Sequence, residues 1–75
     1  MKRNEILTRI KNGEVVFAEQ GVSTAWETSF AIGPERHLAI PIRLDQFAYL
    51  GDHGLISEAK REKKQPWYQT RWKGT

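Results

Sequence analysis

The stretch AIPIRLDQFAYLGDHGLISEAKREKKQPWYQTRWKGT, residues 39–75, carries the clearest structural pattern in the chain. Its apolar side chains recur at three- and four-residue spacing over 41–50, which predicts a helix that begins at a proline and ends before a glycine. A short apolar strand is expected at 55–56. A charged loop over 60–66 then leads into an aromatic strand over 67–72. The fold prediction depends on this order of helix, turn, strand, basic loop and strand.

The beginning of the chain predicts a helix followed by a strand. Ile6 and Ile10 lie four residues apart on one apolar face, which indicates a helix over 3–12. Asn4 is its expected N-cap, because an asparagine side chain accepts hydrogen bonds from the free amides of a first turn. A run of β-branched and aromatic residues flanked by charges predicts a strand over 14–19.

Residues 22–32 allow two interpretations. A serine or threonine a few residues before Glu27 resembles a capping box, which favours a helix. The alternation of Trp26 and Phe30 with polar residues favours a strand, as does the content of β-forming side chains, and we predict a strand. The following segment, 35–40, fits either a short helix or a strand.

Together these elements predict one small α+β domain over residues 1–75, in the order helix–strand–strand–helix–strand–strand. A chain of this length buries a small core. The core is expected to contain apolar side chains from each element: Ile6, Ile10, Val16, Phe30, Leu44, Phe47, Leu50 and Ile56.

The composition excludes several classes of protein and site. The chain has no cysteine, which removes disulfides and thiolate metal sites and favours a cytoplasmic location. No apolar run is as long as a signal-peptide core or a membrane span, so no membrane association is expected. Its two histidines, His37 and His53, lie in dissimilar surroundings, and no phosphate-binding or metal-binding motif is present. We therefore expect no enzyme activity, catalytic residue, cofactor or metal ion.

The charge is distributed unevenly along the chain. Residues 1–59 contain six Lys and Arg against eight Asp and Glu, a net charge of −2. Residues 60–75 contain six Lys and Arg against one Glu, a net charge of +5. A basic end on a slightly acidic body indicates contact with a polyanion. A solvated basic tail is the alternative, but the aromatic residues within 67–72 argue against it, because disordered tails contain few aromatics.

The segment 39–75 also resembles the second half of winged-helix DNA-binding domains. The resemblance rests on the pattern IPxxL at 40–44 and on LxxxGLI at 50–56, which is similar to the exit of a recognition helix into the first wing strand. It implies a winged-helix-like fold with a C-terminal β-hairpin as the wing. It also implies a small DNA-binding regulator of transcription or a phage-type accessory protein, with duplex DNA as the favoured partner. The strand-like segment 14–33 departs from the two helices that the family places first.

The resemblance assigns roles to individual residues. Arg43 and Gln46 would read base edges from the helix, because guanidinium and amide groups match the hydrogen-bonding patterns of bases. Apart from the resemblance, strand alternation over 67–72 puts Trp67, Gln69 and Arg71 on one face and Tyr68, Thr70 and Trp72 on the other. One of these faces would close the core, or Trp67 would stack on exposed bases. The expected phosphate contacts are made by cationic side chains near the C-terminus: Lys60, Arg61, Lys63, Lys64, Arg71 and Lys73.

A protein-interaction module is the second hypothesis. Tryptophan and tyrosine are frequent anchors in protein interfaces, so the chain is also compatible with an adaptor or inhibitor that docks on an acidic protein partner. A homodimer would add buried area to so small a core. Binding that survives nuclease treatment would favour this hypothesis over nucleic-acid binding.

Overall fold

The computed structural model describes residues 1–21, 28–64 and 67–75. The elements in chain order are helix α1 (Arg3–Lys11), strand β1 (Val15–Gly21), strand β2 (Thr28–Gly33), 3-10 helix η1 (Arg36–Leu38), strand β3 (Ile40–Ile42), helix α2 (Leu44–Asp52), strand β4 (Ile56–Lys64) and strand β5 (Trp67–Gly74).

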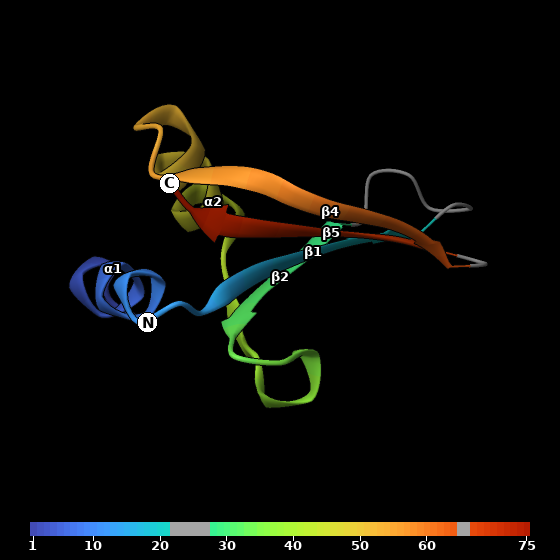
Figure 1. The fold of residues 1–75 in the computed structure, drawn as a ribbon, viewed down its shortest axis with the longest axis horizontal. Helices are drawn as coiled ribbons and strands as arrows, with labels where there is room; N and C mark the ends of the chain where they lie inside the picture. The colour runs from blue at the N-terminus through green and yellow to red at the C-terminus, as the bar shows by residue number, and fades with distance from the viewer. Residues whose placement is uncertain (22–27, 65–66) are drawn as a thin grey trace.

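The strands form one five-stranded antiparallel sheet in the order β3-β2-β1-β5-β4 (Figure 1). The central strand β1 pairs with β2 on one side and with β5, from the far end of the chain, on the other. The sheet therefore joins the first and last strands directly. The β4–β5 hairpin is continuous with the rest of the sheet and does not stand apart from it.

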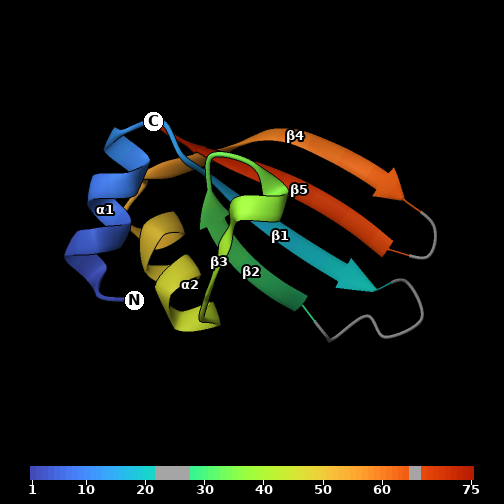
Figure 2. The ribbon, with the colours of Figure 1, turned by 90° about the horizontal axis from the view of Figure 1, so that it is seen from below.

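Both helices lie at one end of the sheet, while the strands extend beyond them at the other end (Figures 1 and 2). Ile6 of α1 and Leu50 of α2 are the buried helical residues of the core. They pack on alternate side chains of the strands, as the two-residue repeat of a β-strand requires. The strand residues of this core are Val16, Phe30, Ile32, Ile42 and Ile56.

The winged-helix-like fold expected from the sequence is wrong. The part of the chain that was expected to form a wing is two long strands of a five-stranded sheet. The helix before it, α2, packs on that same sheet through Leu50 and Phe47. The N-terminal half supplies only α1 ahead of β1, and β2 and β3 follow. The molecule is a strand-rich α+β domain, in which Val16, Phe30 and Ile32 of β1 and β2 bury one face of the sheet against the helices.

Three local expectations are also corrected. The helix predicted to start at Pro41 begins at Leu44, because Pro41 and Ile42 pair with β2 and Arg43 keeps an extended backbone. The expected basic loop over 60–66 is strand as far as Lys64, and 65–66 lie outside the described residues. The N-cap of α1 is Lys2 and not Asn4.

The other expected elements correspond to structure. The helix over 3–12 and the strand over 14–19 appear as α1 and β1, each displaced by a residue or two. The strand interpretation of 22–32 agrees with β2 from Thr28 onward, and 22–27 lie outside the described residues. The segment 35–40 contains η1 and the first residue of β3, so each of its two interpretations holds in part.

The core prediction fails at one position. Leu44 is 66% exposed, because it opens the first turn of α2 beyond the edge of the core. Five of the expected residues are buried, namely Ile6, Val16, Phe30, Leu50 and Ile56, and Ile10 and Phe47 pack against them partly buried. Four buried apolar residues were not expected in the core: Phe17, Ala31, Ile32 and Ile42.

Two glycines should respond in opposite ways to replacement by alanine. A Cβ at Gly33 would lie 2.7 Å from the backbone Cα of Ala39, so Gly33→Ala forces the backbone to shift and should lower the free energy of unfolding by about 1–3 kcal/mol. Gly51 lies in α2, and no atom lies within 4 Å of the position that a Cβ would take. Gly51→Ala should therefore raise the free energy of unfolding by about 0.5–1 kcal/mol. Urea denaturation measures both. A loss of stability in Gly51→Ala would contradict the helical environment described.

Candidate nucleic-acid interface

The β4–β5 hairpin sends its side chains to two opposite faces of the sheet. Trp72 faces the helices, where its ring meets Phe47 edge-on at a centroid distance of 5.3 Å. Arg71, the residue before Trp72 in the strand, therefore faces the other way and places its guanidinium 5.6 Å from the Phe17 ring centroid. A register shift between Glu58 and Lys60 then puts Lys60 directly opposite Arg71.

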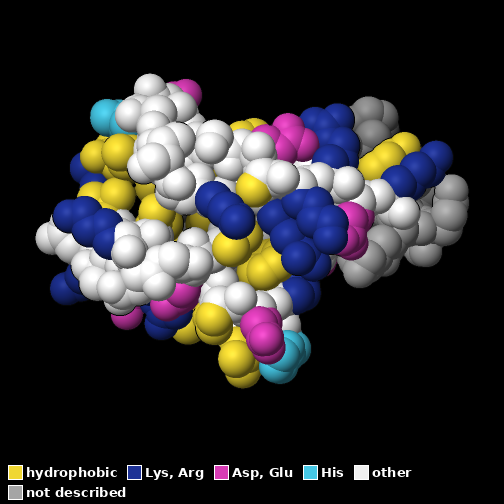
Figure 3. Space-filling model, viewed as in Figure 1, with side chains coloured by type: hydrophobic (Ala, Val, Ile, Leu, Met, Phe, Trp, Pro, Cys, Tyr) yellow, Lys and Arg dark blue, Asp and Glu magenta, His cyan; other side chains and the backbone are white. Residues whose placement is uncertain are grey.

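We call the cluster formed by Arg36, Lys60, Arg71 and Lys73 the basic sheet face. Lys73 shares this face with Arg71 because it lies two residues further along β5. Arg36 reaches the face from η1, where its guanidinium donates to both carboxylate oxygens of Glu19 in β1, at 2.7 and 2.8 Å. In Figure 3, lysine and arginine side chains gather over the middle of β5 and β1.

A hydrogen-bonded chain of side chains holds this face in place. Gln69, which is 2% exposed, donates from Nε2 to Glu19 at 2.9 Å and accepts at Oε1 from Nε of Arg71 at 3.2 Å. The hydrogen bonds to Glu19 raise the pKa of the Arg36 guanidinium above its ordinary value. Arg71 is thus oriented by Gln69 and by the Phe17 ring, and no carboxylate binds it in the described part of the chain.

The charge of the basic sheet face is only partly compensated. Glu62 bonds to Lys60 at 2.7 Å, and Glu19 bonds to Arg36. Across residues 1–21, 28–64 and 67–75, no salt bridge reaches Arg71 or Lys73. Four cations against two carboxylates leave a net charge of +2 on this face.

The remaining hairpin residues are differently placed. Arg61 lies on the helix side of β4, where Glu58 accepts two hydrogen bonds from its guanidinium at 2.8 and 3.2 Å and raises its pKa. Lys63 lies on the same side, with its ammonium 5.8 Å from the Tyr68 ring centroid. The backbones of Lys64 and Trp67 form the last rung of the hairpin, and their side chains lie outside the described part of the structure.

The structure does not bring Arg43 and Gln46 together with these cations. Both lie at the start of α2, where the Arg43 guanidinium donates to Asp45 at 3.1 Å. The Gln46 side chain accepts from the Arg43 amide at 2.9 Å and donates to the carbonyl of Met1, so both ends of its amide are engaged within the fold. The exposed positions of α2 are Leu44, Asp45, Ala48, Gly51 and Asp52, an acidic and apolar surface without the donors that base reading requires.

Sequence reasoning missed Arg36 and the role of Gln69. Arg36 lies far from the basic C-terminal segment in the chain, and only the pairing of β1 with β5 brings Glu19 beside Gln69. The alternation of 67–72 did place Gln69 and Arg71 on one face. That alternation was the one available signal for this part of the site.

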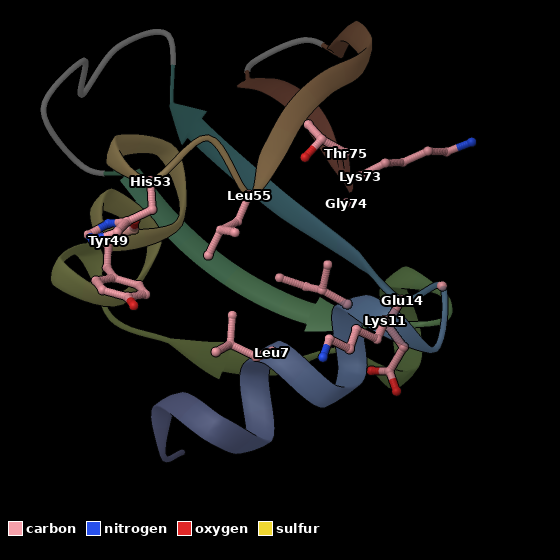
Figure 4. Close-up of a pocket in the computed structure, with 11 residues that line it drawn as sticks. Leu7, Lys11, Glu14, Tyr49, His53, Leu55, Lys73, Gly74 and Thr75 are labelled. Atoms are coloured by element: carbon pink, nitrogen blue, oxygen red, sulfur yellow. The ribbon is translucent and has the colours of Figure 1, made fainter.

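A second feature is a hollow of about 870 Å³ between α1, the end of α2 and the adjoining ends of β4 and β5 (Figure 4). Leu7 and Leu55 point toward one another across it, and the Lys11 ammonium turns toward it. The Lys73 side chain extends away from it. The hollow is therefore distinct from the basic sheet face, although Lys73 lies between the two.

Neither a metal site or membrane-spanning helix in the described ranges nor a related protein was found to identify the function. Among the described residues, no group of three or more His, Asp or Glu side chains gathers as a metal site would require. Neither α1 nor α2, the α-helices in the part of the chain that the structure describes, has the length and apolarity to cross a bilayer. Searches of protein-family models, curated proteins and solved structures found no match to this chain.

Proposed function

We propose that this protein is a non-enzymatic module that binds nucleic acid through its phosphates, using the basic sheet face. Its target is duplex DNA in the cytoplasm, in keeping with the basic C-terminal segment and the absence of cysteine. The observation that carries the proposal is the juxtaposition of Lys60 and Arg71 as opposite residues of two paired strands.

Like charges directly opposite one another destabilise a sheet, so the pairing of Lys60 with Arg71 opposes folding. Glu62 offsets part of the repulsion at Lys60, while Arg71 is held by the neutral Gln69. A phosphate bound between the Lys60 and Arg71 side chains would relieve this repulsion and accept charge-assisted hydrogen bonds from both. Lys73 and Arg36 lie on the same face and would meet neighbouring phosphates.

Binding of this kind is independent of base sequence. Phosphate contacts set the position of a protein on a duplex and carry no sequence information, whereas specificity requires side chains at base edges. The Gln46 amide accepts from Arg43 and donates to Met1 within the fold, and the exposed side of α2 is acidic and apolar. We therefore expect affinities for unrelated duplexes of equal length to agree.

The test is fluorescence anisotropy with a labelled duplex of about 20 base pairs, titrated in salt from about 50 to 200 mM. The double variant Lys60→Gln/Arg71→Gln should bind at least roughly tenfold more weakly at low salt. Its plot of log K against log salt should be shallower by about 0.9 for each phosphate that the variant no longer neutralises. Circular dichroism checks folding, because Arg71 also packs on Phe17.

The matched control is Lys2→Gln/Lys11→Gln, which removes the same charge from the two ends of α1, outside the basic sheet face. This control should retain the affinity and the salt slope of the unmodified chain. The single variant Lys60→Gln, whose side chain is exposed, tests the site without disturbing the packing of Arg71. Equal losses of affinity in the two double variants, or no binding at low salt, would refute the proposal.

A further inference from the structure

The hollow lies between the two helices, each of which packs on the sheet. Leu7 and Ile10 line it from α1, and Leu55 lines it from the turn before β4. All three are partly buried against the core, and their remaining surface faces the hollow. The result is an apolar groove (Figure 4), at the end of the molecule where both helices lie (Figure 1).

One wall of the groove is an aromatic side chain held in a fixed position. The Tyr49 ring lies 4.1 Å from the His53 ring, centroid to centroid, and the Arg3 guanidinium lies 4.0 Å from the Tyr49 centroid. The His53 ring nitrogen Nδ1 lies 3.0 Å from the Tyr49 carbonyl oxygen. A wall whose side chains are already ordered loses little conformational entropy when a ligand binds.

The polar rim of the groove is cationic. The Lys11 ammonium turns toward the hollow (Figure 4), and within the described residues no carboxylate forms a salt bridge with it. Glu14 also borders the groove, but its carboxylate bonds to Arg9 at 2.9 Å. An apolar ligand that carries a carboxylate would therefore match both the lining and the charge.

We propose that this groove binds a segment of a partner protein that carries an apolar side chain next to an acidic one. The apolar side chain would lie between Leu7 and Leu55, and the carboxylate would bond to Lys11. The hollow is half-open, and about 870 Å³ is more than one side chain occupies, so it fits a peptide lying along its length. This site is separate from the basic sheet face and does not depend on nucleic-acid binding.

The experiment is selection of peptides from a random phage-displayed library against the whole chain, followed by anisotropy with the labelled synthetic peptides. Selected peptides should share an apolar residue beside Asp or Glu. Their affinity should fall at least tenfold in Lys11→Glu, a change at an exposed position that leaves the core intact. Lys63→Glu, the same charge reversal near the hairpin tip, should leave it unchanged.

Nuclear magnetic resonance locates the bound peptide on the unmodified chain, so the result does not depend on how a substitution affects folding. Adding a selected peptide should shift the amide signals of Leu7, Lys11 and Leu55 and leave those of Lys60 and Arg71 in place. The proposal is overturned if selection yields no peptides, if the peptides lack acidic residues, or if Lys11→Glu and Lys63→Glu bind them equally. A second copy of the chain is the alternative occupant, because Leu44 and Asp45 are themselves an exposed apolar residue beside an acidic one. Self-association of the protein that Leu44→Ser abolishes would show that a second copy fills the groove, and would also overturn the proposal.

Discussion

Replacing Leu50 with alanine is expected to lower the free energy of unfolding by about 3 kcal/mol. Leu50 is 1% exposed and is the buried residue through which α2 joins the core. The substitution removes apolar surface from that core and leaves a cavity that the surrounding strands can only partly fill. A domain of this size has a total stability of only several kcal/mol, so this loss is a large share of it.

The same substitution at Leu44 provides the control. Leu44 lies in the same helix but is 66% exposed, so Leu44→Ala should change the stability by less than about 0.5 kcal/mol. Chemical denaturation followed by circular dichroism measures both variants. Equal losses of stability at the two positions would mean that α2 is rotated about its axis relative to the structure described.

The second large effect is expected at Phe47. Its ring stacks on Phe30 at a centroid distance of 4.4 Å and meets Trp72 edge-on. These interactions connect α2 to β2 and to β5, which are separated in the sheet by β1. Phe47→Ala should therefore lower the free energy of unfolding by about 3 kcal/mol, because it removes both buried apolar surface and the interactions between the rings.

A conservative variant separates the two contributions at Phe47. Phe47→Leu keeps most of the apolar volume and removes only the interactions between the rings, so its loss of stability should stay below about 1.5 kcal/mol. Urea denaturation gives both values, and near-ultraviolet circular dichroism follows the Trp72 environment. A loss of stability below about 1.5 kcal/mol in Phe47→Ala would show that the aromatic cluster contributes little to the fold.

The position of the cations bears on how the protein meets a polyanion. A flexible wing loop would present them in many orientations, whereas the strand backbone of β4 and β5 divides them between two faces. On the helix side, Glu58 engages Arg61. On the opposite side, Arg71 and Lys73 retain uncompensated charge within the described residues. This difference is the reason to test the basic sheet face first.

Some features of this protein follow from the sequence alone. The three- and four-residue spacing of apolar residues places α1 and the body of α2, and runs of β-forming residues place β1 and β5, because these patterns depend on neighbours along the chain. The concentration of cations after residue 59 is likewise a property of the sequence. Two-residue alternation along the last strand also puts Gln69 and Arg71 on the face opposite Trp72.

Tertiary structure decided the rest. Pro41 became a strand residue because an edge strand pairs with β2 there, although the residue type equally suits a first helical turn. Pairing of β1 with β5 brought Arg36 and Glu19 beside Gln69 and Arg71, and no local pattern encodes that meeting. The groove between α1 and α2 likewise exists only because both helices pack on one sheet. Contacts between residues distant in the chain have no signature in local periodicity, which is why the sequence determined the elements and only the assembled sheet determined the sites.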